Sequence, residues 1–293
     1  VNRSWGIFSK NSSVTMRGLE GSARTLILLD GVPMNKSAGG SINWAMLNPD
    51  DIERIEVIKG PASALYGNNA MAGVINIITT TPKEKFTGSV SALAGTYKTF
   101  GSNFLAQSSL IENNKGFYLN LSGFYRQGDG YLFEPFENRD STSAKLFLNE
   151  GSIHLKSGYQ FNKNNTIELS YAFYQDYRGE GVKVYEKRGK FNSIVNHYST
   201  LKYDTKLGNN EINVLAYYQH ENYLNNNESL NFYGEYKLNE DQSFKNDIGI
   251  WASISREINS RNSIIGGIDL KYGDVNSTSI YMTATDILIY KGK

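Results

Sequence analysis

The sequence predicts an all-β transmembrane barrel preceded by a small α+β domain that would plug it. From Phe86 onward, apolar and polar residues alternate in run after run, as in strands with one apolar and one polar face. Before Phe86, short apolar runs are separated by Gly and by four of the five Pro residues, which is typical of a compact module. We therefore expect a plug domain over residues 1–85 and a barrel over residues 86–293.

The composition is compatible with a barrel in a membrane. No run approaches the ~18 apolar residues of a spanning helix, and mean hydropathy is only −0.44. A barrel strand needs only ~10 residues with every second one apolar, so low hydropathy does not exclude a membrane location. The 20 Tyr residues suit a membrane interface, although a soluble β-rich protein stays open on composition alone. The absence of Cys excludes disulfides and cysteine-ligated metals, and a net charge of +1 gives no field for nucleic acid.

The first expected strand, residues 25–30 (TLILLD), is almost continuously apolar, as in a strand covered on both faces. Gly31 and Pro33 should end it in a turn. Residues 42–47 can form one helical turn, and Asn48 before Pro49 should stop it.

Residues 52–59 (IERIEVIK) form the second expected strand, which carries charge on both faces. Arg54 and Glu56 share one face, whereas Glu53 and Lys59 share the other. Such a strand would suit a wet, polar lumen better than a dry core.

The end of this domain combines a short helix with a third strand. Pro61 can open a helical turn over residues 62–65, which Gly67 would end. Residues 73–79 (GVINIIT) are the third expected strand.

The barrel region contains about nine expected strands, the last being the run 278–290. In two of them the faces can be assigned from alternation. We expect the following side chains to face lipid: Ile153, Leu155, Ile167 and Leu169. Lys156 and Glu168 should face the lumen.

The expected connections alternate in length. Tight, Asn-rich turns fall at residues 113–116, 162–165, 207–210 and 259–262. Residues 97–100 are the exception, a tight turn expected at the opposite end, among the long connections. Longer connections are expected at residues 128–150, 179–196 and 225–242. Short turns at one end and long loops at the other are typical of bacterial outer-membrane barrels, with the short turns periplasmic. A soluble sandwich would not require this alternation.

Bacterial barrels of this kind have an even number of strands, so a count of about nine is unusual. A barrel of about eight strands could not enclose the first region, because its own side chains fill its bore. We therefore expect the chain to be part of a larger barrel.

Five segments of the first region resemble the plug of TonB-dependent outer-membrane receptors in order and spacing. They are residues 16–19 (MRGL), 28–33 (LLDGVP), 52–60 (IERIEVIKG), 61–67 (PASALYG) and 73–79 (GVINIIT). The resemblance covers about residues 14–80. It implies a plugged barrel of about 22 strands, with the coupling segment, early plug and later strands outside this chain.

The resemblance also implies a function. A member of this family is a monomer in the outer membrane of a Gram-negative bacterium. It imports a scarce solute with energy from TonB and its inner-membrane complex. An iron–siderophore chelate is the foremost ligand, and no resident cofactor or enzymatic activity is expected. Cobalamin or haem uptake, lipoprotein-assisted glycan uptake, a passive porin and a soluble binding module remain alternatives.

The candidate gating residues are those of the plug motifs, whose charges would pair within the plug or with the wall, or simply cover the plug surface. They are Arg17, Gly18, Asp30, Gly31, Glu53, Arg54, Glu56, Lys59, Gly60, Tyr66 and Gly67. An Arg54–Glu56 pair that holds the plug closed is the sharpest form of this hypothesis.

The candidate ligand-binding residues lie in expected loops, with packing under those loops as the alternative. Asn35, Lys36 and Trp44 surround the Gly39-Gly40-Ser41 loop, and Tyr131 and Phe133 lie in the first long connection. His154, His197 and His220 are far apart in the sequence, so no metal site is expected. No carboxylate pair or nucleophile constellation predicts a catalytic site.

Overall fold

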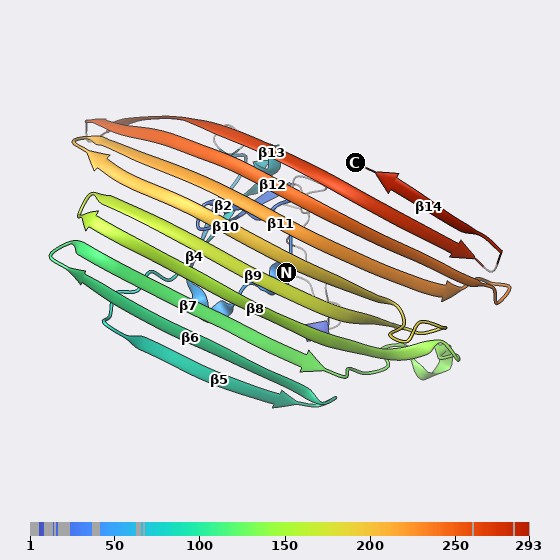
Figure 1. Cartoon of the computed structure of the whole chain (residues 1–293). Helices are drawn as coiled ribbons and strands as arrows, with labels where there is room; N and C mark the ends of the chain where they lie inside the picture. Colours follow the sequence, from blue (N-terminus) through green and yellow to red (C-terminus); the bar gives the residue numbers. More distant parts are fainter. Residues whose placement is uncertain are drawn as a thin grey trace.

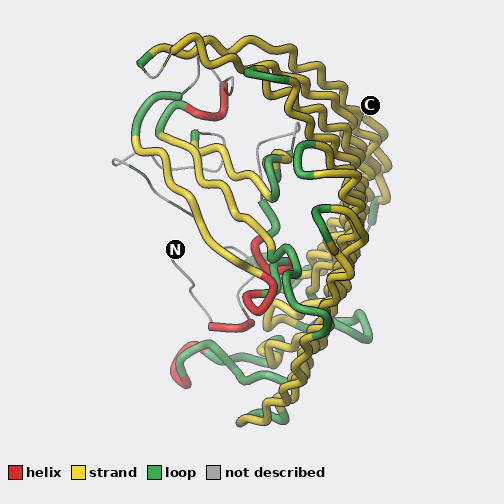
Figure 2. Tube along the Cα trace, turned by 90° about the vertical axis from the view of Figure 1, so that its left-hand side faces the viewer, coloured by secondary structure: helices red, strands yellow, loops and turns green. Residues whose placement is uncertain are grey.

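The computed structural model describes residues 6–8, 14, 16, 24–36, 42–62, 66, 68–259, 261–283 and 285–292. They form a four-stranded sheet and a ten-stranded sheet. Figure 1 shows the larger sheet, here called the wall, as long strands laid side by side in chain order. In the side view of Figure 2 the wall is curved, and the smaller sheet, here called the plug sheet, lies on its concave side.

The plug sheet has the strand order β2-β1-β4-β3. Its strands are β1 (Thr25–Leu29), β2 (Val32–Pro33), β3 (Ile52–Lys59) and β4 (Gly73–Thr79). β4 pairs parallel with β1 and antiparallel with β3, so β3 is an edge strand. The three predicted strands of this region are confirmed.

Short 3₁₀ helices connect these strands: η1 (Gly6–Phe8), η2 (Trp44–Met46), η3 (Pro49–Asp51) and η4 (Asn68–Ala70). The predicted turn of helix at 42–47 is η2, whose N-cap Asn43 accepts a hydrogen bond from the amide of Ala45 at 3.2 Å. The helix predicted over residues 62–65 falls largely outside the described residues.

The β1–β2 hairpin has a two-residue turn. Asp30 and Gly31 both have positive φ, 50° and 88°, as a type I′ turn requires. The sequence Asp-Gly suits this turn because Asp tolerates the left-handed region and Gly adopts it without strain. The turn places the Asp30 carboxylate at the end of the sheet that meets the wall.

The wall is a continuous antiparallel meander in which each strand pairs with its sequence neighbour. Its strands are β5 (Thr87–Gly95), β6 (Thr99–Glu112), β7 (Lys115–Gly128), β8 (Ser143–Asn162), β9 (Asn165–Val182), β10 (Phe191–Leu207), β11 (Asn210–Leu230), β12 (Tyr236–Asn259), β13 (Asn262–Thr283) and β14 (Ile287–Gly292). A further 3₁₀ helix, η5 (Phe136–Asn138), lies between β7 and β8.

The wall thus has ten strands rather than about nine. The run 278–290, expected as one strand, comprises the end of β13 and the start of β14. Residues 284–286 separate the two, and no Gly, Pro or Asn signals the break in the sequence.

The short turns lie as predicted, but the long connections are shorter than expected. They span residues 129–142, 183–190 and 231–235. The strands continue past the apolar alternation with polar side chains, as where residues 225–230 of β11 pair with residues 236–241 of β12. Alternation marks only the part of a strand that has one dry face, so the polar extensions resemble loops in the sequence.

The two faces of the wall carry different side chains, as predicted. Lys156 is only 2% exposed and faces the plug, whereas Ile153 and Leu169 lie about half exposed on the convex face, at 48% and 52%. Glu168 reaches toward Lys156 on the concave side. No helix among the described residues is long and apolar enough to span a bilayer.

The plug sheet packs against the concave face through an apolar cluster that both sheets share. Ile27, Met34 and Ile77 of the plug contact Phe124 and Tyr174 of the wall, all nearly fully buried. The polar groups around this cluster form the candidate site.

Candidate functional site

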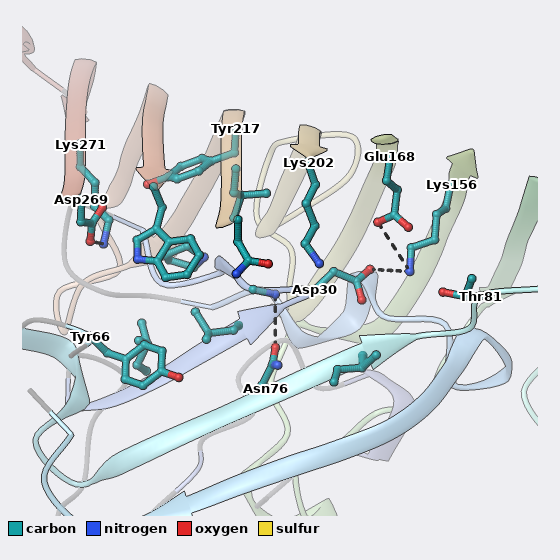
Figure 3. Close-up of a pocket in the computed structure, with 18 of the residues that line it drawn as sticks. Asp30, Tyr66, Asn76, Thr81, Lys156, Glu168, Lys202, Tyr217, Asp269 and Lys271 are labelled. Atoms are coloured by element: carbon teal, nitrogen blue, oxygen red, sulfur yellow. Dashed lines mark hydrogen bonds and ion pairs between the residues drawn. The ribbon is translucent and has the colours of Figure 1, made fainter. Parts of the chain in front are cut away.

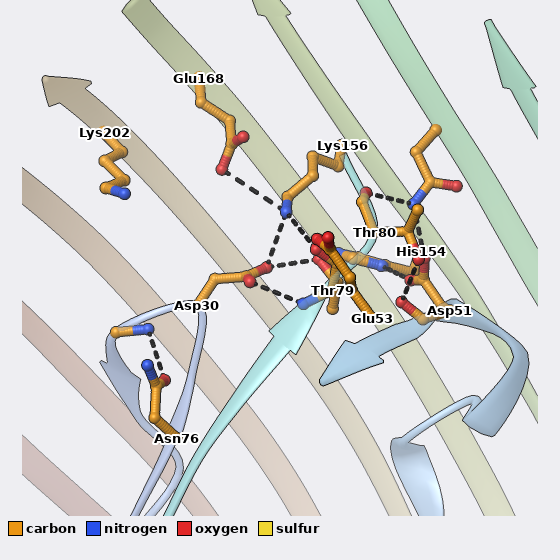
Figure 4. A network of polar contacts seen from close by, with 12 residues as sticks. Asp30, Asp51, Glu53, Asn76, Thr79, Thr80, His154, Lys156, Glu168 and Lys202 are labelled. Atoms are coloured by element: carbon orange, nitrogen blue, oxygen red, sulfur yellow. Dashed lines mark hydrogen bonds and ion pairs between the residues drawn. The ribbon is translucent and has the colours of Figure 1, made fainter. Parts of the chain in front are cut away.

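Polar side chains of the plug and the wall meet beside the shared apolar cluster. We call this set the plug–wall lock, and Figure 4 shows Asp30, Asp51, Thr79 and Thr80 of the plug converging with His154 and Lys156 of the wall. The plug contributes Asp30, Asp51, Thr79 and Thr80, and the wall contributes Asn120, Ser122, His154 and Lys156.

The first half of the lock is centred on Lys156 of β8. Its ammonium lies 3.2 Å from the Asp30 carboxylate and 3.9 Å from that of Glu168, and it donates to the carbonyl of Thr79 at 3.2 Å. Asp30 also accepts from the Thr79 amide at 2.9 Å and hydroxyl at 2.6 Å. A buried cation is thereby compensated by two carboxylates and a carbonyl, which offsets part of the penalty of burying it.

The second half is centred on Asp51, the last residue of η3. The helix is fixed by Pro49 at its start and by the Asn48 side chain, which accepts from the Asp50 amide at 3.2 Å. The Asp51 carboxylate accepts hydrogen bonds from Asn120 and from the Ser122 hydroxyl, the latter at 3.2 Å. The His154 ring nitrogen contacts the same carboxylate.

A further contact lies on the other side of the β1–β2 hairpin. The buried Lys36 ammonium is 3.6 Å from Glu221 of β11 and 4.7 Å from the centre of the Tyr198 ring. Burial alone would lower the pKa of Lys36, but attraction by Tyr198 and Glu221 outweighs burial and raises it. Gln219 donates to the carbonyl of Pro33 at 2.6 Å.

A cavity of about 430 Å³ separates the plug sheet from the wall next to Lys156 (Figure 3). Wall side chains point into it from β8 to β13, including Lys202, Tyr217 and Asp269, and Asn76 faces them from the plug. Most of these wall residues lie in the halves of the strands that lead into the short turns. The lining mixes charges of both signs with aromatic rings, so water can fill the cavity.

The predicted gate pair makes its ion pairs within the plug, although Arg54 also lines the cavity between plug and wall. Arg54 is 2.9 Å from Glu56 and 3.7 Å from Glu53, and Lys83 is 3.5 Å from Glu53. All four side chains belong to the exposed edge of the plug sheet or its continuation, with Arg54 53% exposed. Among the described residues Arg54 and Glu56 form ion pairs only within the plug, which is one of the arrangements that the sequence left open.

The other predicted plug residues have structural surroundings. Asp30 and Gly31 form the hairpin turn, and Gly60 follows β3 at φ 125°. Tyr66 packs against the plug's second apolar cluster. Lys59 is exposed at the end of β3. Arg17, Gly18, Gly67 and the loop 39–41 lie outside the described residues.

The predicted ligand-binding residues are mostly engaged in packing. The Asn35 side chain bridges the amide of Ile27 and the carbonyl of Thr25, and both Asn35 and Lys36 are at least nine-tenths buried. A ligand could not reach either side chain without displacing the plug, so these contacts assign both to plug packing.

The three aromatic candidates also make packing contacts. Trp44 packs on the shared apolar cluster. Tyr131 contacts Tyr97 and Phe8, with ring centres 5.1 and 5.9 Å apart, and Phe133 packs with Leu146. Tyr131 and Phe133 are half-buried, so only part of each ring is accessible to solvent.

The histidines separate into two groups. His154 belongs to the lock, whereas His197 and His220 lie on adjacent strands with ring centres 6.0 Å apart. Within the described part of the chain, no group of three or more His, Asp or Glu side chains could hold a metal ion.

Comparison with known proteins agrees with this architecture. Residues 2–74 match the TonB-dependent receptor plug domain. This match and the relatives below confirm the predicted resemblance of the chain to part of a TonB-dependent receptor. The chain is 33% identical over 189 residues to the vitamin B12 transporter BtuB of Vibrio vulnificus, covering 64% of this chain and 28% of that protein. It is 32% identical over 172 residues to the ferrienterobactin receptor of Escherichia coli, covering 54% and 21%.

Solved structures show the same fold. The siderophore receptor PirA of Acinetobacter baumannii has a TM-score of 0.58 at 15% identity, over 92% of this chain and 50% of that one. The ferric-catecholate receptor Fiu of E. coli has a TM-score of 0.65 at 13% identity, over 92% and 44%. The receptor chain described here therefore spans about half the length of these solved structures, and less than a third of the curated relatives.

Sequence reasoning missed Asp51 and His154 as lock residues of this receptor, although it placed Lys156 on the correct face. Asp51 precedes a strand and His154 alternates with apolar residues, but 103 positions separate them in the chain. No pattern within a single sequence reports such a pairing.

Proposed function

We propose that this receptor imports a scarce solute, foremost an iron–siderophore chelate, across the outer membrane of a Gram-negative bacterium. In this proposal residues 1–85 are the plug and residues 86–293 are wall strands. TonB and its inner-membrane complex would supply the energy, and the receptor would act as a monomer. The observation that carries the proposal is the plug–wall lock, which seats the plug in the hollow where a solute would pass.

The chemistry of the lock supports a plug that moves. Each lock contact is a hydrogen bond or ion pair, which water can replace when plug and wall separate. An apolar seal of equal size would lose about 25 cal/mol for every Å² exposed to water. The polar part of the plug–wall contact, which lies beside the shared apolar cluster and a cavity that water can fill, therefore suits a gate.

Two features support a chelate as the solute. Relatives carry the names ferrienterobactin receptor and rhizobactin receptor, with 32% and 31% identity over 172 and 179 residues. The long connections present the exposed rings of Phe136, Phe232 and Tyr233, at 84%, 97% and 84% exposure. Exposed aromatic faces of this kind suit a flat, partly apolar ligand.

Cobalamin is the second candidate, because the match to the vitamin B12 transporter covers 64% of the chain. Both candidates are large and scarce, and both would need a gate rather than an open pore.

The experiment is an uptake assay with the full-length receptor in a Gram-negative host that lacks its own siderophore and cobalamin receptors. Radiolabelled ferric catecholate, ferric hydroxamate and cyanocobalamin are supplied separately, with and without TonB. We expect TonB-dependent accumulation of one ferric chelate. Accumulation of cyanocobalamin alone would select the second candidate. Uptake that is independent of TonB, or no uptake of any of the three by a receptor present in the outer membrane, would contradict the proposal.

A further inference from the structure

Two histidines form a pair on the convex face of the wall, which the proposed transport does not use. His197 of β10 and His220 of β11 are register partners, so they lie opposite each other on adjacent strands. Their ring centres are 6.0 Å apart, and both side chains are half-buried. Their sequence neighbours Tyr198 and Gln219 contact the plug from the concave face. The histidine pair therefore faces the surroundings of the wall.

The hydrogen bonds of the two rings turn their other nitrogens toward each other. The Nδ1 atom of His197 lies 2.8 Å from the Tyr171 hydroxyl on β9, and that of His220 lies 2.8 Å from the Asn246 side-chain oxygen on β12. Because β9 and β12 flank the pair on opposite sides, the two Nδ1 atoms point apart. In an imidazole the edge opposite Nδ1 carries Nε2, so both Nε2 atoms lie where the rings face each other.

The neighbours of His220 also fix its protonation at one nitrogen. The side-chain oxygen of Asn246 can only accept, so His220 Nδ1 carries a proton and donates it. The Asn246 amide group is oriented because it donates to Asp274 at 3.2 Å while its oxygen accepts from the Tyr218 hydroxyl at 2.9 Å. A neutral imidazole protonated at Nδ1 has a lone pair on Nε2, and this arrangement is typical of histidines that bind a metal ion.

The separation of the rings suits one shared ion. A metal–nitrogen bond is about 2.0 Å long, so the ion lies about 3 Å from each ring centre, and ring centres about 6 Å apart can share it. Among the described residues, no side chain is hydrogen-bonded to either Nε2. Imidazole suits Cu²⁺, Ni²⁺ and Zn²⁺. Two imidazoles leave the other coordination positions open, and water can fill them because the pair is half-exposed.

The pair lies at the margin of the apolar part of the convex face. Leu201 and Ile248 lie toward the short turns from it, whereas the polar Asn222 lies toward the long connections. The rings of Phe173 and Phe244 flank the pair, with centres 5.2 and 6.5 Å from the nearer imidazole. An aromatic belt would account for a row of rings, but not for two ring nitrogens that face each other without a partner.

We propose that His197 and His220 bind one divalent transition-metal ion between their Nε2 atoms, with Cu²⁺ held most tightly. Water completes the coordination shell, and the ion clips β10 to β11. The preference for Cu²⁺ follows from the general order of affinities of nitrogen ligands for divalent metals. The proposal goes beyond the proposed function and does not rest on it, because binding needs only the pairing of these two strands.

The test uses the full-length receptor, purified in a neutral detergent without a polyhistidine tag. Isothermal titration calorimetry measures binding of Cu²⁺ and of Zn²⁺ to the parent and to the variants H197Q, H220Q and H197Q/H220Q. The double variant reports binding elsewhere on the protein. Asn246→Ala removes the partner that orients His220, and Asn276→Ala is its matched control on the neighbouring strand of the same face. Electron paramagnetic resonance of the Cu²⁺-loaded parent counts the coordinating imidazole nitrogens.

We expect each single histidine variant to lose at least tenfold in affinity for Cu²⁺ at the site that the double variant lacks. Asn246→Ala should weaken binding by about tenfold, and Asn276→Ala should stay within twofold of the parent. The parent should bind Cu²⁺ more tightly than Zn²⁺, and its resonance spectrum should lose two imidazole nitrogens in the double variant. Single variants within twofold of the parent would overturn the proposal. So would a parental spectrum that matches that of the double variant.

Discussion

At the residue scale, the lock shows how a buried charge is tolerated. Lys156 is compensated by Asp30, Glu168 and the Thr79 carbonyl, all within 4 Å. Removing one partner of such a group leaves another charge buried without compensation, which costs about 3–5 kcal/mol. Replacing both partners by neutral groups costs much less.

Lys156→Met should therefore weaken the seating of the plug by about 3–5 kcal/mol, because Asp30 and Glu168 lose their cation. The double variant D30N/K156M should recover at least half of this loss. Protease susceptibility of the plug and the urea midpoint of the purified receptor measure both effects.

Lys202→Met is the matched control, since Lys202 faces the same cavity but is 36% exposed and pairs with Asp204 on the wall. A change of less than about 1 kcal/mol is expected there. A K202M variant as unstable as K156M would show that any cation lost from this face destabilises the receptor.

The Asp30–Gly31 turn makes a second prediction at this scale. Gly31 has φ 88°, and the nearest atom to an added Cβ is 4.0 Å away, so only backbone strain opposes a side chain there. Gly31→Ala should cost about 1–2 kcal/mol, whereas Gly31→Asn should be close to neutral because Asn tolerates positive φ. Urea unfolding of the two variants measures the difference, and equal stability would mean that the turn relaxes.

At the element scale, the wall strands could be predicted well and their ends poorly. The faces of β8 and β9 follow from alternation, since Lys156 and Leu169 lie on opposite sides as expected. The ends of β11 and β12 could not be predicted from this alternation, because both faces of the paired strands are polar there. The edge strand β3 was predicted as a strand, but its neighbours depend on a pairing with β4 that local sequence does not encode.

Leu169→Arg should hinder assembly of the wall. Its side chain is on the convex face, where a cation near the bilayer centre costs about 2–4 kcal/mol. Asn213→Arg is the control, because Asn213 lines the cavity on the concave side and the new side chain has room and water. The amount of heat-modifiable receptor in the outer membrane compares them, and equal amounts would show that the convex face does not meet lipid.

At the scale of the whole molecule, alternating connection lengths orient the wall. Trypsin added to intact cells should cut after Arg139, Lys187 or Arg188, which lie in the long connections. It should spare Lys163 and Arg261 in the short turns until the cells are permeabilised. Peptide mapping identifies the sites, and early cleavage after Lys163 or Arg261 would reverse the orientation.

The lock rather than the predicted Arg54–Glu56 pair should control passage through the whole receptor. Asp51→Lys places a cation beside His154 and removes the acceptor used by Asn120 and Ser122, so the plug should loosen. Glu56→Lys changes a pair within the plug edge strand and leaves the contacts of the plug with β7 and β8 intact, so we expect little effect. Sensitivity of cells to large antibiotics should rise only for Asp51→Lys. Equal sensitivity of both variants would support the Arg54–Glu56 pair of β3 as the gate.

The meander of the wall also sets an order of events in time. Every wall strand pairs with the strand just before or after it in the chain, so each hairpin can close over a short loop at small entropic cost. The parallel pairing of β1 with β4 and the contacts from Asp51 to β8 instead join distant positions. Because non-local contacts form slowly, the wall strands would have to pair with one another before the plug sheet could pack against them.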